Sequence, residues 1–99
     1  MATEITIKDK VKLALRISHN LLDDEIGDVI ASGRQEMERA GVSAEIANSS
    51  LKVVETALKT YALAYYSEPT TAEKYTESFK YQLDNIRKST LEVPSNDDV

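Results

Sequence analysis

The chain has 99 residues, of which 41% are hydrophobic and 29% are charged, so it is long enough for one globular domain and too short for two. It contains no Cys, which excludes disulfides and thiolate chemistry, and its formal net charge is −5, with the excess of acid in residues 23–50 and 92–99. Neither an apolar signal segment nor a stretch near the roughly 18 apolar residues of a membrane span occurs, so we expect a soluble, cytoplasmic protein that binds no membrane.

The first predicted helix covers residues 6–17. Thr6 followed by Asp9 has the spacing of an N-terminal capping pair, and apolar residues then recur at helical intervals. Basic residues spaced four apart form one row along this helix: Lys8, Lys12 and Arg16. A solvated helix face is the ordinary explanation of such a row, and a basic contact surface is the alternative.

The second predicted helix covers residues 24–40 and is the most acidic element of the chain. Asp23 or Asp24 is expected to cap its start, where the helix dipole favours acidic residues, and Gly41 is expected to end it. Its acidic residues are Asp24, Glu25, Asp28, Glu36 and Glu38. This helix could meet the basic row of a neighbouring subunit, or both sets of charges could face water.

Two further helices are predicted over residues 50–66 and 71–89. The third helix is preceded by three candidate capping residues, Asn48, Ser49 and Ser50. Pro69 is expected to stop it, and Thr70 with Glu73 has the spacing of a capping box for the fourth helix. Because the connection between them is short, the two helices should form an antiparallel hairpin.

The whole pattern predicts one all-α domain over residues 1–91, with four helices, the C-terminal hairpin and no sheet. No strand pattern or internal repeat interrupts it. Residues 92–99, EVPSNDDV, have too little apolar surface to offset the entropy lost on ordering. We therefore predict that they form a disordered acidic tail.

All aromatic residues lie in residues 61–81, YALAYYSEPTTAEKYTESFKY. Four fall on facing stripes of the predicted hairpin and are expected to form a buried seam: Tyr61, Tyr65, Tyr75 and Phe79. Tyr66 and Tyr81 fit the seam less well, so they are candidates for exposed rings at a partner surface, although they could also lie flat on their own helices. With two lysines against three glutamates, the segment is a poor stacking platform for nucleic acid.

A candidate DNA-binding feature is the turn Ala40-Gly41-Val42-Ser43, which resembles the turn of a helix-turn-helix. The segment that would read DNA, residues 44–50, contains Glu45 and neither Lys nor Arg, whereas phosphate neutralisation is the main source of DNA affinity. We therefore expect a helix end followed by a loop, and we keep a small DNA-associated regulator as the alternative function.

Candidate catalytic and metal-binding residues are scarce. His19 could share a metal with Asp23 and Asp24, but this spacing matches no established site, and a polar loop followed by capping aspartates explains the same residues. The other carboxylates stand singly on predicted helix faces, without a nucleophile beside a base. We therefore expect no catalytic residue, no metal and no cofactor, and we do not expect an enzyme.

Two long segments resemble a known family. Residues 11–41, VKLALRISHNLLDDEIGDVIASGRQEMERAG, combine a short first helix, an acidic cap and a long second helix, and look like the small head–tail connector (adaptor) proteins of long-tailed phages. Residues 58–89, LKTYALAYYSEPTTAEKYTESFKYQLDNIRKS, are similar to the C-terminal half of these connectors in phages and prophages of Gram-positive bacteria. The resemblance covers residues 6–89 and rests on helix patterning with a few polar markers: Arg16, Asp23, Asp24 and Tyr61.

The resemblance implies an all-α subunit that assembles as a ring beneath the dodecameric portal of the capsid, extends the DNA channel and docks the next neck or tail completion protein. It also implies that DNA passes without sequence-specific binding, and that the protein resides in the virion neck after assembly in the bacterial host cytoplasm. No catalytic residue or cofactor is implied. Because a ring needs two different faces on each subunit, we expect subunit or portal contacts at Lys8, Lys12, Arg16, Asp24, Asp28, Tyr66 and Tyr81.

Overall fold

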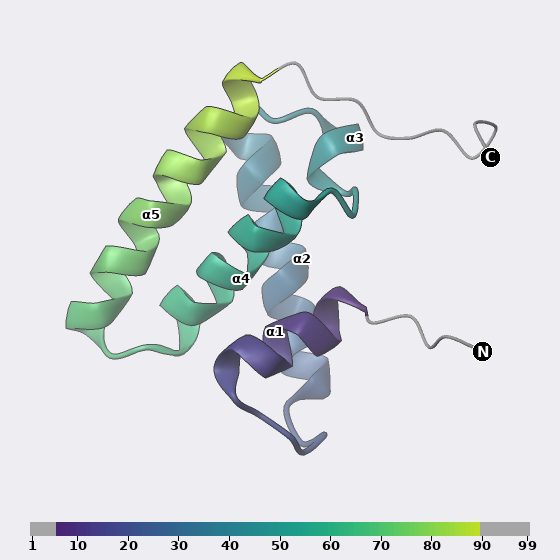
Figure 1. Cartoon of the computed structure of the whole chain (residues 1–99), viewed down its shortest axis with the longest axis vertical. Helices are drawn as coiled ribbons and strands as arrows, with labels where there is room; N and C mark the ends of the chain where they lie inside the picture. The colour runs from purple at the N-terminus through teal and green to yellow at the C-terminus, as the bar shows by residue number, and fades with distance from the viewer. Residues whose placement is uncertain (1–5, 90–99) are drawn as a thin grey trace, which may run out of the picture.

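The computed structural model describes residues 6–89 (Figure 1). Within this range the chain forms five helices and no strand, so the fold is all-α, as the sequence predicts. The tail that was predicted to be disordered, residues 92–99, lies outside the described residues. The helices are α1 (Ile7–Leu15), α2 (Asp23–Arg39), α3 (Ala44–Ala47), α4 (Lys52–Tyr66) and α5 (Pro69–Lys88).

Helix α3 was not predicted from the sequence, because a loop was expected after Gly41. The hydroxyl of Ser43 accepts a hydrogen bond from the backbone N–H of Ile46 at 3.3 Å and caps this short helix. Ile46 and Ala47 are buried, so the connection between α2 and α4 is part of the core. A helix of four residues is too short to produce a recognisable helical period in the sequence.

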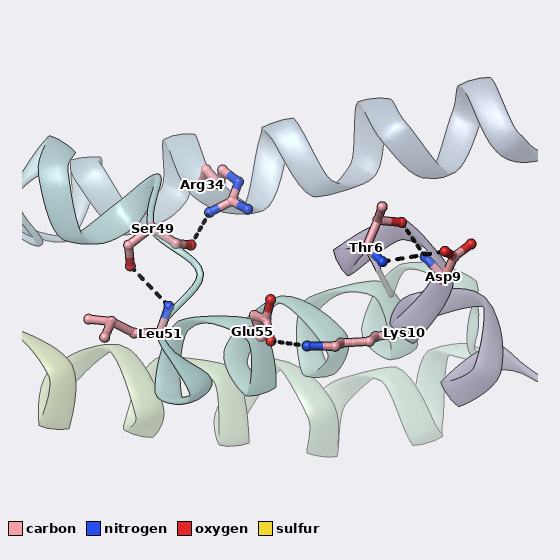
Figure 2. Close-up of polar contacts among 7 residues, drawn as sticks. All are labelled: Thr6, Asp9, Lys10, Arg34, Ser49, Leu51 and Glu55. Carbon is pink, nitrogen blue, oxygen red and sulfur yellow. Dashed lines mark hydrogen bonds and ion pairs between the residues drawn. The ribbon is translucent and has the colours of Figure 1, made fainter. Parts of the chain in front are cut away.

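The first two helices begin differently. At α1 the predicted capping box is confirmed: the N–H of Asp9 donates to Thr6 Oγ1 at 3.1 Å, and the N–H of Thr6 donates to Asp9 Oδ2 at 3.3 Å (Figure 2). At α2 the predicted cap is wrong, because Leu22 occupies the cap position and both aspartates already lie in the first turn. The Asp23 carboxylate is instead bound by Lys12 of α1.

The predicted caps of the last two long helices are also wrong. α4 follows Leu51, whose N–H donates to Ser49 Oγ at 3.3 Å, and no side chain caps the helix itself (Figure 2). Pro69 was expected to lie between the two helices, but it is the first residue of α5. Proline is favoured there because the first helical position needs no N–H donor. Thr70 and Glu73 therefore lie inside α5, and they form no capping box.

The central helix of the fold is α4, which packs against α1, α2 and α5 (Figure 1). Its contact with α5 is the most extensive, and the two helices form the predicted antiparallel hairpin. The largest fully buried side chains come from α1, α2 and α4, and they are Val11, Ile26, Met37, Val54 and Leu58. Because burying each of them contributes roughly 1.5–3 kcal/mol, hydrophobic stabilisation is concentrated around α4.

Charged side chains connect the helices within and beside this core (Figure 2). Glu55 of α4 is only 8% exposed, and its Oε1 accepts a hydrogen bond from Lys10 Nζ of α1 at 2.6 Å. Arg34 of α2 donates from Nη1 to the carbonyl oxygens of Ala47 and Ser49 at 2.8 and 3.0 Å, which holds the α3 segment against α2. Burial lowers the pKa of the Arg34 guanidinium, and the nearby Glu55 carboxylate partly offsets this effect.

The aromatic seam of the hairpin agrees only in part with the prediction. Tyr61 and Phe79 pack with their ring centroids 5.0 Å apart; Phe79 is buried, while Tyr61 and Tyr75 are half-buried. The prediction is wrong for the next pair, because Tyr65 is 57% exposed whereas Tyr66 packs against the core. Besides the side that packs on α5, α4 has a second covered side, which packs on α1 and α2, and Tyr66 packs against the core. Helical spacing alone does not reveal this second covered side.

Candidate functional site

A groove opens between α2, α4 and α5, and we call it the α2–α4–α5 groove. Its volume is about 460 Å³. Most of its lining is apolar and comes from α4 and α5, through Tyr61, Ala64, Tyr65, Phe79 and Leu83. Tyr65, the exposed ring that the sequence placed inside the seam, therefore stands at the edge of this groove.

The groove exists because α5 packs along α4 and approaches α2 only near the C-terminal end of α2 (Figure 1). Gly41, which follows the C-cap residue Ala40 of α2, has a φ of 106°, and an added Cβ there would lie 2.8 Å from Arg87 Cδ of α5. The positive φ favours glycine at this position, and the close approach is to the flexible side chain of Arg87. Away from this contact the two helices diverge (Figure 1), and the groove lies between them.

Charged side chains stand at the edge of the groove. Arg39 Nη1 lies 3.7 Å from Glu36 Oε2, and both side chains are well exposed, so this pair is weak and can exchange partners. Lys80 lines the groove from α5. Burial, followed by the charge of Glu36, raises the pKa of Tyr61. The lining has one carboxylate and no histidine, so it offers apolar contact and charge recognition but no nucleophile beside a base.

A second exposed apolar surface lies at the opposite end of α2, where α1 leads into α2. Leu13 is 71% exposed and Leu21 is 86% exposed. Leu13 lies in the last turn of α1 and Leu21 in the loop that leads into α2, and Lys12 Nζ holds this loop near α1 by donating to Asn20 Oδ1 at 2.7 Å. We call this surface the α1–α2 corner and define it as Leu13, Arg16, Leu21 and Asp24.

The basic row expected along α1 is not one free surface. The Lys12 side chain is largely buried, with its ammonium 2.9 Å from Asp23 Oδ1 of the same chain. Lys8 is half-buried and passes over Gly27, where an added Cβ would lie 3.7 Å from Lys8 Cε. Only Arg16 stays exposed, because the chain turns there with a φ of 61° and α1 ends two residues earlier than predicted.

The other predicted contact residues lie on different faces. Asp24 and Asp28 are exposed on α2, and Tyr81 is 69% exposed on α5. Tyr66 is half-buried, so its prediction as an exposed ring is wrong, and its hydroxyl lies near Glu25 without a hydrogen bond of good geometry among residues 6–89. Burial, followed by the charge of Glu25, raises the pKa of Tyr66 to about 12.

Sequence reasoning missed both apolar surfaces. The corner had a signal, because Leu13 lies off the apolar stripe of α1 and Leu21 stands in a polar loop, where a buried position is not expected. The sequence contains no signal for the groove, because the groove depends on the angle between α2 and α5, and this angle cannot be predicted from helical periodicity.

The residues considered for a metal site serve other contacts. His19 Nδ1 accepts a hydrogen bond from the N–H of Leu21 at 3.2 Å, and Asp23 pairs with Lys12. In the part of the chain that the structure describes, no group of three or more His, Cys, Asp or Glu side chains could hold a metal ion. Over the same residues, no helix has both the length and the apolar character needed to cross a membrane.

The turn that resembles a helix-turn-helix leads into α3, which has the sequence AEIA. A recognition helix fills the major groove with several exposed side chains, but α3 has four residues, two of which are buried. Its only charged residue is Glu45. This segment therefore provides no basic surface for DNA.

Comparisons with known proteins found nothing similar: no protein-family model, no curated protein and no solved structure matches this chain. The interpretation of function therefore rests on the two exposed surfaces and on the resemblance of the sequence.

Proposed function

We propose that this chain is a structural protein of a phage virion, a head–tail connector that assembles as a ring under the portal and links the DNA-filled head to the neck or tail. The observation that supports this best is the pair of uncovered apolar surfaces, the α2–α4–α5 groove and the α1–α2 corner, at opposite ends of α2. A ring closes through contacts between two different surfaces of each subunit. The resemblance of residues 6–89 to connectors supports the same role.

In this proposal the partners are the portal protein, a neck or tail completion protein and further copies of the chain. DNA passes through the channel without sequence-specific contacts. The net charge of −5 is consistent with passage, since it supplies little of the phosphate neutralisation on which DNA affinity depends. The protein acts through binding surfaces, without a catalytic residue or a cofactor, in the neck of the virion after assembly in the host cytoplasm.

Particle analysis tests this proposal. A stop codon in the gene, in the phage or prophage that encodes it, should yield packaged heads and free tails but few joined particles in electron micrographs. Supplying the parent gene from a plasmid should restore infectious titre, and mass spectrometry should detect the chain in purified virions. Virions that lack the chain, or a normal titre from the stop-codon mutant, would refute the connector role.

A DNA titration addresses the alternative of a regulator. Fluorescence anisotropy with a labelled duplex should show no binding at low salt, because α3 carries no Lys or Arg. Tight binding that weakens steeply as salt rises would instead favour the regulator. A known basic DNA-binding protein serves as the positive control.

A further inference from the structure

We propose that the two exposed apolar surfaces bind each other between copies of this chain, so that the α1–α2 corner of one subunit enters the α2–α4–α5 groove of the next. The inference rests on the proposed ring for its choice of partner, and it adds which surfaces meet. Both surfaces lie within the described residues, and neither is covered there.

The apolar parts of the two surfaces match. Leu13 and Leu21 are each more than two-thirds exposed, and both stand where α1 leads into α2, so a partner that covers this corner can bury both side chains. The groove presents Tyr61, Phe79 and Leu83 beside the exposed ring of Tyr65. Its volume of about 460 Å³ is large enough to receive aliphatic side chains from another molecule.

The charges around the two surfaces are complementary. Arg16 and Asp24 are the charged residues of the corner, and both are exposed. Glu36, Arg39 and Lys80 stand at the groove. Arg16 can therefore pair with Glu36, whose contact with Arg39 is long and exposed, while Asp24 pairs with Lys80 or Arg39. Such pairs contribute mainly to register and to the rate of encounter, and the leucines supply the apolar contact.

The distance between the two surfaces makes the contact intermolecular. They lie toward opposite ends of α2, whose 17 residues span about 25 Å. One subunit therefore cannot join its own corner to its own groove. Each pair of subunits retains one free corner and one free groove, so association can continue until a ring closes.

The test uses full-length variants in which one surface is disabled. Leu13→Ser combined with Leu21→Ser removes the apolar part of the corner. Thr76→Trp fills the groove from an exposed position on α5. Because all three positions are exposed, the fold should be retained, which far-UV circular dichroism and thermal melting verify. Val53→Ser, at an exposed apolar residue of α4 outside both surfaces, is the matched control.

Sedimentation velocity over a concentration series should show that the parent and Val53→Ser associate equally. Each disabled variant should associate at least tenfold more weakly. An equimolar mixture of the two disabled variants should form a 1:1 dimer and nothing larger, because one intact corner meets one intact groove and the other surfaces are disabled. This complementation is expected only for a contact between two different surfaces.

Three results would overturn the inference: a parent that stays monomeric at millimolar concentration, a disabled variant that associates like the parent, or a mixture that forms no dimer. These results are distinct from failure of the connector role. A chain found at the virion neck that associates through other surfaces would keep the connector role and reject this contact. If the chain associates through these surfaces but is absent from virions, the contact between copies is kept and the connector role is rejected.

Discussion

The ammonium of Lys12 in α1 lies 2.9 Å from Asp23 Oδ1 in α2, and this pair joins the two helices across the loop between them. The Lys12 side chain is largely buried. Lys12→Glu would place two carboxylates together there, so we expect the free energy of unfolding to fall by roughly 1–3 kcal/mol. Arg16→Glu, on the exposed turn that follows, should change it by less than about 0.5 kcal/mol. Equal melting temperatures for the two variants would contradict this prediction.

Gly33 of α2 marks a close approach to α4. An added Cβ would lie 2.9 Å from Leu58 Cδ2 and 3.2 Å from Tyr61 Cδ2. Gly33→Ala should therefore lower the free energy of unfolding by about 1–3 kcal/mol, because packed neighbours must move. Gly27→Ala is the matched control, since its nearest contact is 3.7 Å away and helix propensity should make it neutral or stabilising by up to about 1 kcal/mol. Urea unfolding measures both, and a parent-like midpoint for Gly33→Ala would refute the close contact.

Phe79 and Tyr81 are near neighbours on α5 but differ in burial. Phe79 packs on Tyr61 inside the hairpin, whereas Tyr81 is exposed. Phe79→Ala should lower the free energy of unfolding by roughly 3–5 kcal/mol, because it removes a buried ring and leaves a cavity. Tyr81→Ala should leave it within about 0.5 kcal/mol of the parent. Thermal melting of both variants checks this, and a normal melting temperature for Phe79→Ala would disprove the seam.

The buried Glu55 carboxylate depends on Lys10. Lys10→Met leaves this carboxylate without its 2.6 Å partner, so we expect a loss of roughly 1–3 kcal/mol in the free energy of unfolding. Changing both residues to Met removes the buried charge as well and should recover much of that loss. Lys74→Met, at an exposed position of α5, is the control. A double variant less stable than Lys10→Met in urea would contradict the prediction.

The Tyr66 hydroxyl is buried near Glu25 and makes no hydrogen bond of good geometry among residues 6–89. Tyr66→Phe should therefore be neutral, or stabilising by up to about 1 kcal/mol, at pH 7. In the parent the folded state holds the pKa of Tyr66 at about 12, above the ordinary value of about 10, so it favours the neutral phenol. The stabilisation of the folded state by the neutral Tyr66 phenol is fully present below about pH 10, and it is lost as the pH rises from about 10 to about 12.

Tyr66→Phe should consequently lose less stability than the parent over this alkaline range. Urea unfolding at a series of pH values measures the difference. Identical pH profiles for the parent and Tyr66→Phe would show that the Tyr66 phenol is not responsible.

The sequence by itself determined the helical character of the chain, because helix formation depends on local spacing. Apolar residues at intervals of three and four placed the four long helices, and the Thr6–Asp9 capping box forms as predicted because its two residues are only three positions apart. Gly41 likewise follows α2, as its freedom to adopt a positive φ suggests. These features involve residues within one or two turns of each other.

Only the tertiary structure decided what each helix face touches. Lys12 belongs to a basic row in the sequence, but the fold brings Asp23 to it and leaves Arg16 free. Tyr65 and Tyr66 are adjacent and chemically identical, yet only Tyr66 is covered, because α4 packs between two sets of neighbours. The α2–α4–α5 groove arises from the divergence of α5 from α2, and such crossing angles depend on side-chain packing between elements far apart in the chain.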